Sequence, residues 1–237
     1  MNTMKKTMRI DIVSAVPDLL SSPLNNSILK RAQDKKKVEI VVHNLRDYAF
    51  NKHRQIDDKP FGGEPGMVLK PEPFFECLKE LIKERTYNNI IFTTPRGKIF
   101  NQKAANRFSL SENIIIVAGH YKDIDERVRQ KFATDEISIG NFVLTGGELP
   151  ALLITDAIVR LIPGVLNDSE SALNDSFQNG NVVEAPCYTR PAEYEGMKVP
   201  EVLLSGNKKE IEKWKEEQSL SLTKKWKDYN KNGENNG

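Results

Sequence analysis

The first 165 residues alternate short apolar runs with amphipathic segments. In the amphipathic segments apolar residues recur every three to four positions, which predicts helices. The run 113–118 is apolar at nearly every position, as expected for a strand covered on both faces of a parallel sheet. The alternation therefore predicts an α/β fold. The expected strands are 9–15, 38–44, 89–94 and 113–118, and the expected helices are 17–35, 71–84 and 149–162.

A polar stretch rich in Asn, Asp and Ser follows the α/β part. We interpret this stretch, residues 167–181, as a flexible linker between an α/β domain (1–166) and a small helical domain (182–237). Four apolar residues are candidates for the core of the second domain. The last residues, 230–237, are polar and are expected to be disordered. The candidate core residues are Trp214, Leu220, Leu222 and Trp226.

Composition excludes several classes of protein. The two cysteines, Cys77 and Cys187, lack the spacing of a disulfide framework or a zinc site, which favours a cytoplasmic protein. No run approaches the roughly 20 apolar residues that cross a bilayer. The three histidines, His43, His53 and His120, are not spaced as metal ligands, so we predict no metal site and expect each to be solitary. A net charge of +2 does not by itself indicate nucleic acid.

Three segments carry glycine or proline where an apolar run ends: 93–97, 119–123 and 138–149. Ligands of parallel α/β sheets bind beyond the carboxyl ends of the strands, so these segments are expected to converge on one pocket. Each segment alone is also typical of an ordinary turn. No GxGxxG follows a strand and no GxxxxGK[ST] occurs, so neither a Rossmann nor a P-loop nucleotide site is indicated.

The non-periodic loop 47–67 separates the second and third expected strands, and loops of this length are often functional. His53 and Arg54 in this loop are candidates for nucleotide contact. Basic side chains near the C-terminus are candidates for phosphate contact, which positions a nucleic acid without reading its bases. These are Arg190, Lys198, Lys208 and Lys209.

Segment 138–150, followed by Ile-Pro-Gly-Val at 162–165 and Asn-Asp-Ser-Phe at 174–177, resembles the bacterial tRNA (guanine-N1)-methyltransferase family, TrmD. Further matching blocks occur in the family's order, and the resemblance spans about 9–226. It implies a SPOUT-class parallel sheet with a deep trefoil knot, a small C-terminal helical domain that binds tRNA, and a homodimer with composite active sites. Knots are otherwise rare, so this expectation depends on the resemblance alone. The further blocks are 57–63, 65–67, 124–128, 188–191 and 202–207.

The resemblance also implies the reaction, in which S-adenosylmethionine donates a methyl group to N1 of guanosine 37 of tRNA. Asp57 and Gly66 lie in matching blocks and join His53 and Arg54 as candidate substrate contacts. The donor is expected to bind in the knot. The matching donor-site positions are Thr93, Thr94, Pro95, Gly97, Gly119, Tyr121, Ile139, Gly140, Asn141, Phe142, Val143, Leu144, Gly146 and Gly147.

Guanine N1 carries a proton at neutral pH, so its methylation requires a base. Asp175 matches the family's general base, and Arg160 matches the residue that stabilises negative charge on O6. From spacing alone, the segment around Asp175 is also typical of a helix cap or an Asx-turn. Likewise, Arg160 stands four residues after Asp156, which suits an ion pair along a helix.

Several positions depart from the family pattern. Lys122 stands where many members have Glu, so the residues that would bind magnesium, a candidate cofactor, are left open; Asp123 and Asp125 are alternatives. Arg96, Asn141 and Glu64 replace the usual Gln, Asp and Gly. Two alternatives are a knotted methyltransferase with the same fold that acts on ribose 2′-oxygens, for which the block around Asp175 has no evident use, and a non-catalytic RNA-binding protein that uses the basic surfaces.

Overall fold

The computed structural model describes residues 7–166, 175–178 and 180–234. The chain divides into two compact units, Met1–Asn167 and Asp168–Gly237, and each is described by itself. No helix in the described part of the chain is long and apolar enough to span a membrane.

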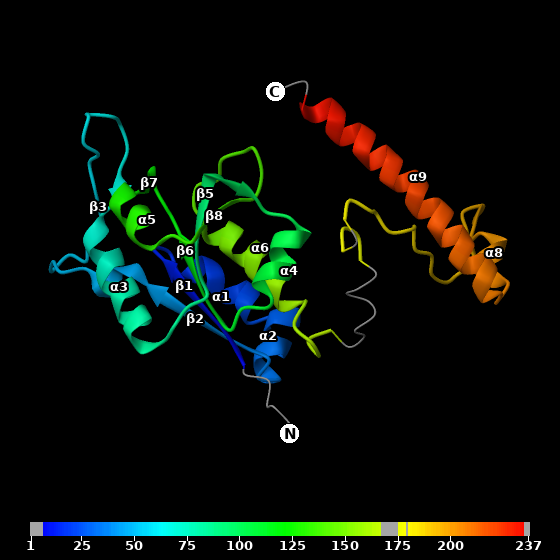
Figure 1. Cartoon of the computed structure of the whole chain (residues 1–237), viewed down its shortest axis with the longest axis horizontal. Coiled ribbons are helices and arrows are strands. Elements are labelled where there is room, and N and C mark those ends of the chain that lie inside the picture. Colours follow the sequence, from blue (N-terminus) through cyan, green and yellow to red (C-terminus); the bar gives the residue numbers. More distant parts are fainter. Residues whose placement is uncertain (1–6, 167–174, 179, 235–237) are drawn as a thin grey trace. The chain divides into compact units, whose positions relative to one another are not determined.

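A five-stranded sheet forms the centre of the first unit (Figure 1). Its order is β2-β1-β6-β5-β8, and every neighbouring pair is parallel. All strands therefore present their carboxyl ends at one edge, where ligands of such sheets bind. The strands are β1 (Met8–Ser14), β2 (Val38–Asn44), β5 (Asn89–Ile99), β6 (Asn113–Ala118) and β8 (Asp135–Ser138).

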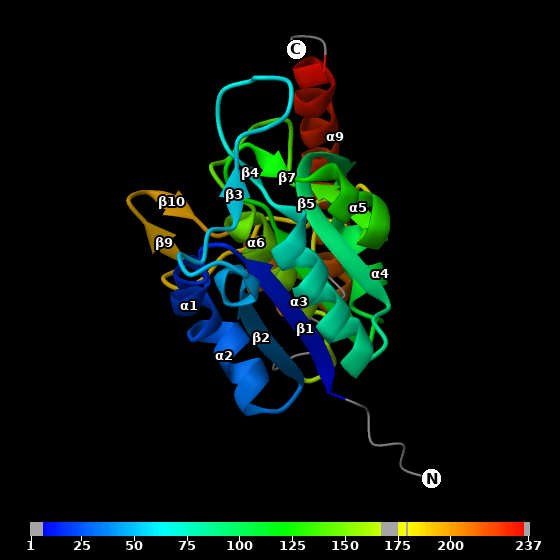
Figure 2. The same ribbon diagram turned by 90° about the vertical axis from the view of Figure 1, so that its left-hand side faces the viewer.

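Helices cover both faces of this sheet, as the uninterrupted apolar sequence of β6 requires. Ile114 and Ile116 pack in a core with α1, α2, α4 and α6, whereas Ile115 and Val117 pack in a second core with α3 and α5. Figure 2 shows α1 and α2 on one side of β1 and α3 on the other. The helices are α1 (Asp18–Leu24), α2 (Ser27–Asp34), the 3-10 helix η1 (Leu45–Tyr48), α3 (Pro71–Glu84), α4 (Gln102–Phe108), α5 (Glu126–Phe132) and α6 (Glu148–Val159).

A small three-stranded sheet stands beside the main one. It has the order β3-β4-β7, with β3 and β4 antiparallel and β4 and β7 parallel. The loop 59–67 joins β3 to β4 and projects from the unit in both views (Figures 1 and 2). We call this loop the arm. The strands are β3 (Asp57–Asp58), β4 (Val68–Leu69) and β7 (Asp123–Ile124).

The second unit is built along one long helix, α9 (Lys208–Glu234). The Phe177 ring lies 5.2 Å from the Trp226 ring, and the backbone N–H of Val183 donates to the Thr223 hydroxyl over 2.9 Å. Residues 175–178, part of the predicted linker, therefore form a turn that packs on α9; residues 167–174 and 179 lie outside the described residues. The remaining elements are β9 (Glu193–Tyr194), β10 (Met197–Lys198) and α8 (Glu201–Leu204).

The predicted α/β class is confirmed, and the boundaries 38–44, 71–84 and 113–118 match the structure. Three expectations were wrong. The helix expected at 17–35 is two helices, since Pro23 closes the first and Ser27 has a φ of 52°. Residues 230–234, expected to be disordered, continue α9. Leu220, a candidate core residue, is 69% exposed.

Candidate functional site

Hydrogen bonds join the ends of β5 and β6 to the start of α6. The Thr93 hydroxyl donates to the carbonyl of Val117 over 3.1 Å, and the N–H of Gly147 donates to the carbonyl of Gly119 over 2.6 Å. His120 also forms an antiparallel bridge with Gly146. The three segments predicted to converge therefore lie together at the carboxyl edge of the sheet.

The close approach of these backbone segments explains why glycine occupies two positions. A Cβ on Gly147 would meet the Thr93 hydroxyl and would lie 2.8 Å from the Gly119 nitrogen. A Cβ on Gly97 would collide with the backbone of β8 at Glu136 and Ile137. Both positions need glycine because another backbone approaches too closely for a side chain.

The three segments line a hollow, and most of the predicted donor-site residues border it. Gly97, Gly140 and Asn141 are the exceptions. Gly97 instead packs against β8, and a Cβ on Gly140 would lie 2.5 Å from the ring of Phe142, which borders the hollow. The predicted residues on the lining are Thr93, Thr94, Pro95, Gly119, Tyr121, Ile139, Phe142, Val143, Leu144, Gly146 and Gly147.

Tyr121 borders the hollow with a φ of 60°, a strained conformation for a bulky residue that is often found at functional sites. Arg46 donates to the Tyr121 hydroxyl over 3.4 Å and to the carbonyl of Arg54 over 3.3 Å. This contact brings the predicted Arg54 segment to the hollow. The Arg54 side chain pairs with Asp47 at 3.0 Å, and His53 is exposed.

A buried carboxylate stands behind the hollow. Glu148, 1% exposed in the first turn of α6, accepts a hydrogen bond from the Ser14 hydroxyl over 2.8 Å, and its other oxygen lies 3.3 Å from His120 Nδ1. His43 likewise contacts one carboxylate, since its Nε2 lies 2.7 Å from Asp11. Sequence analysis missed Glu148, because only its place after two glycines at a predicted helix start marked it.

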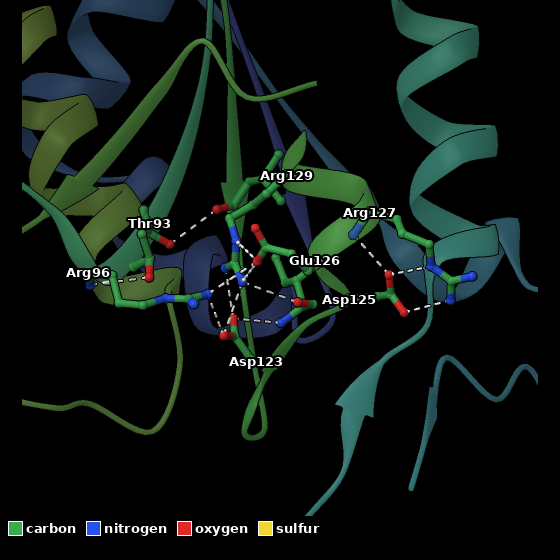
Figure 3. Close-up of polar contacts among 10 residues, drawn as sticks. Thr93, Arg96, Asp123, Asp125, Glu126, Arg127 and Arg129 are labelled. Atoms are coloured by element: carbon green, nitrogen blue, oxygen red, sulfur yellow. Dashed lines mark hydrogen bonds and ion pairs between the residues drawn. The ribbon is translucent and has the colours of Figure 1, made fainter. Parts of the chain in front are cut away.

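Charged side chains form a cluster beside the hollow (Figure 3). Arg129, 4% exposed, donates to both oxygens of Asp123 over 2.9 and 3.1 Å and to Glu126 over 2.9 Å, and Arg96 donates to Asp123 over 2.9 Å. Burial, the largest single effect, raises the pKa of Asp123, but the hydrogen bonds from Arg129 and the Ile124 N–H, together with the charges of Arg129 and Arg96, hold it below its ordinary value. Asp123 is thus an ionised carboxylate already engaged by two arginines.

Asp125, the other carboxylate considered for this site, caps α5. Its side chain accepts from the N–H of Arg127 over 3.0 Å and from the Arg127 guanidinium over 2.8 Å, which lowers its pKa (Figure 3). Asp125 is thus engaged in a helix cap and in an ion pair with Arg127. Among the residues that the structure describes, no group of three or more His, Cys, Asp or Glu side chains is placed to hold a metal ion.

The remaining predicted site residues fall in three places. Asp57 pairs with β4 in the small sheet, and a Cβ on Gly66 would touch the Lys122 side chain at 3.7 Å; Lys122 borders the hollow. Arg160 ends α6 in the first unit. Asp175 is half-buried and opens the turn 175–178 in the second unit. Arg160 and Asp175 therefore belong to different units.

Comparison with known proteins identifies the family of the chain. Residues 8–230 match the family model described as tRNA (Guanine-1)-methyltransferase TrmD. Proteins named tRNA (guanine-N(1)-)-methyltransferase are 58% identical to the chain in Cytophaga hutchinsonii, 56% in Bacteroides fragilis and 54% in Chlorobaculum tepidum. These alignments cover 91 to 92% of this chain and 92 to 96% of each relative. The chain belongs to the tRNA (guanine-N1)-methyltransferase family.

Proposed function

We propose that this protein transfers a methyl group from S-adenosylmethionine to N1 of guanosine 37 in tRNA, beside the anticodon. The observation that carries the proposal is the convergence of three loop segments on one hollow at the carboxyl edge of a parallel sheet, in a chain that matches this family over 8–230. In keeping with the family, we propose that the sheet carries a deep trefoil knot and that the protein acts in the cytoplasm, where tRNA is found.

The residues around the hollow fit the donor. Pro95, Ile139 and Leu144 offer apolar surface for an adenine ring, while the backbone at Gly119 and Gly147 can approach a ligand closely. S-adenosylmethionine supplies an electrophilic methyl group on a positively charged sulfur. The chain holds the donor in place and excludes water around the donor.

Asp175 and Arg160 act on the guanine. We assign to Asp175 the removal of the N1 proton, since the nitrogen lone pair becomes nucleophilic only when that proton leaves. Negative charge then spreads to O6, where the Arg160 guanidinium stabilises it by about 3 kcal/mol. Residues 1–166 form the catalytic domain, and residues 182–237 form the tRNA-binding domain.

A second copy of the chain completes the site. Three apolar side chains near the hollow and on α6 are strongly exposed: Val143 at 81%, Leu149 at 58% and Leu153 at 47%. Leu149 and Leu153 are one helical turn apart and share a face. Covering this face with the same face of another chain would bury them, so we propose a homodimer in which Asp175 of one chain serves the hollow of its partner.

The reaction is tested with purified protein, labelled donor and unmodified tRNA that carries two adjacent guanosines around position 37. We expect label at N1 of guanine. Methylation of a ribose 2′-oxygen would identify the alternative knotted methyltransferase. Tight tRNA binding without donor binding or transfer would identify an RNA-binding protein.

The role of Asp175 is tested by Asp175→Asn, which keeps the shape but removes the basic oxygen. Single-turnover methyl transfer should fall by about 100-fold or more, while donor affinity stays nearly unchanged. Raising the pH should partly restore the rate because more guanine loses its proton in solution. Asp34→Asn, at an exposed carboxylate on α2, is the control. A wild-type rate in Asp175→Asn would leave Asp175 as a turn residue only.

A further inference from the structure

The arm, residues 59–67, carries the most exposed aromatic side chain of the described residues. Phe61 is 100% exposed. A single exposed apolar residue is common, but a whole phenyl ring in water loses the stabilisation that burial provides. The ring therefore contributes nothing to the core of the unit and is available for contact with a ligand.

The base of the arm is fastened to the wall of the hollow. The N–H of Lys122 donates to the carbonyl of Met67 over 3.0 Å, and the Lys122 ammonium donates to the carboxylate of Glu64. Val68, which follows the arm, pairs with Asp123 across β4 and β7. Lys122 and Asp123 both border the hollow. The arm that carries Phe61 is therefore joined at its base to the wall of the hollow where we propose methyl transfer.

Beyond that base the arm extends freely. Gly62 and Gly63 have φ values of 91° and 76°, and no described atom lies within 4 Å of a Cβ built on either. Such backbone favours glycine and lets the chain turn sharply. Both views show the arm projecting beyond the sheets (Figures 1 and 2).

The substrate chemistry makes an aromatic ring useful here. N1 lies on the pairing edge of guanine, and an enzyme reaches such an atom by taking the base out of its stack, which costs stacking free energy. An aromatic side chain that stacks on a base recovers part of that free energy. A ring on an arm that is joined to the wall of the hollow can replace part of the stacking that the target loses.

We propose that Phe61 stacks on a nucleobase next to the target guanosine and so holds the tRNA loop open for methyl transfer. The inference rests on the proposed function and adds a residue to its substrate site. A protein surface is a poorer fit, because protein interfaces need a contiguous apolar patch and the neighbours of Phe61 on the arm are Pro60, Gly62, Gly63 and the charged Glu64. One isolated ring suits one base.

The test measures Phe61→Ala, Phe61→Leu and Phe61→Tyr with an anticodon stem-loop RNA and with S-adenosylmethionine. Phe61→Ala and Phe61→Leu should each weaken RNA binding by about 10-fold or more, while Phe61→Tyr stays near wild type and donor affinity does not change. Leu110→Ala removes another exposed apolar side chain, 86% exposed, and should change neither affinity. A 2-aminopurine beside the target guanosine should become brighter in complexes of Phe61→Ala than of wild type, since its fluorescence is quenched by stacking.

Two results would overturn the proposal. Wild-type RNA affinity in Phe61→Ala would mean that the ring makes no contact, and wild-type affinity in Phe61→Leu would mean an apolar contact without stacking. A failure of the proposed function is distinguishable from both results. In that case the wild-type protein would methylate no guanine N1 in the same RNA, whatever the affinities of the Phe61 variants.

Discussion

At the scale of single residues, the structure contains a buried carboxylate that sequence patterns do not reveal. Asp11, fully buried on β1, is bonded to Arg9, His43 and Tyr87, each over 2.7 Å. Burial raises its pKa, but the hydrogen bonds from His43, Arg9 and Tyr87 outweigh burial and lower the pKa from 3.8 to about 2. The ionised form is therefore the stable one in the folded protein.

This shift predicts how stability depends on pH. The folded pKa of Asp11 lies below the unfolded value, so its contribution, about 2 kcal/mol, is present above about pH 4 and is lost as the pH falls towards 2. Asp11→Asn should lower the free energy of unfolding by about 3 kcal/mol at pH 7, because it leaves Arg9 without its buried partner.

Urea unfolding from pH 7 to pH 3 measures both effects. The gap between wild type and Asp11→Asn should narrow as the pH falls, while Asp34→Asn, at an exposed ion pair with Lys30, should follow wild type throughout. A gap that stays constant down to pH 3 would contradict a depressed pKa.

A residue's structural role can be predicted from the sequence when it depends on neighbouring residues in the chain. Gly147 and Gly119 could be predicted, since a glycine at a strand end is visible in the chain itself. Glu148 could not, because its partners Ser14 and His120 are 134 and 28 residues away and come together only in the folded sheet.

At the scale of elements, β5 is interrupted where it meets the hollow. Thr93 and Lys98 both align with Ile137 of β8, so the residues between them bulge out of the sheet. The bulge carries Arg96 to Asp123 and thereby ties the end of β5 to β7. Both tied segments contribute to the lining of the hollow.

Arg96→Gln should loosen this tie and weaken binding of S-adenosylmethionine by about 2- to 5-fold. The effect is small because the pair is partly exposed and Arg129 still holds Asp123. Calorimetry at low salt measures it, and added salt should reduce the difference from wild type. Arg127→Gln breaks the pair with Asp125, away from the hollow, and should leave donor affinity unchanged. Equal losses in both variants would indicate a general effect on the fold.

Element prediction succeeded where the pattern was long. The helix 71–84 shows four turns of periodicity, and β6 is apolar throughout, so both could be located from the chain alone. β8, with four residues, and α4 and α5, with seven each, were not predicted because a short segment offers too few repeats of a period.

At the scale of the whole molecule, the proposed dimer places Asp175 and the hollow of one active site on different chains. Mixing Gly140→Trp with Asp175→Ala should then restore activity, because one site in each mixed dimer keeps both parts. Gly140→Trp should block the hollow, since even a Cβ there meets the Phe142 ring. Methyl transfer by the mixture, relative to each variant alone, is the measurement.

Subunit exchange is verified by tagging one variant and recovering the other with it. The melting temperature of each variant shows that it is folded, and Asp175→Ala should also keep the donor affinity of the wild type. Full exchange without recovered activity would place each active site within one chain. At this scale the sequence predicted the α/β class from periodicity, whereas the knot, the dimer and the reaction came from resemblance, because no local pattern encodes a connection between distant strands.

The order of the central sheet also governs how the chain is made. β1 leaves the ribosome early, yet it pairs on one side with β6, and the partner of Arg9 is Asn113. At about 5 to 20 residues per second, the nascent chain waits roughly 5 to 20 seconds for that neighbour. Throughout this interval the apolar surface of Ile10 and Ile12 is available to other nascent chains and to chaperones. Slower translation therefore lengthens the period in which the nascent chain is prone to aggregate.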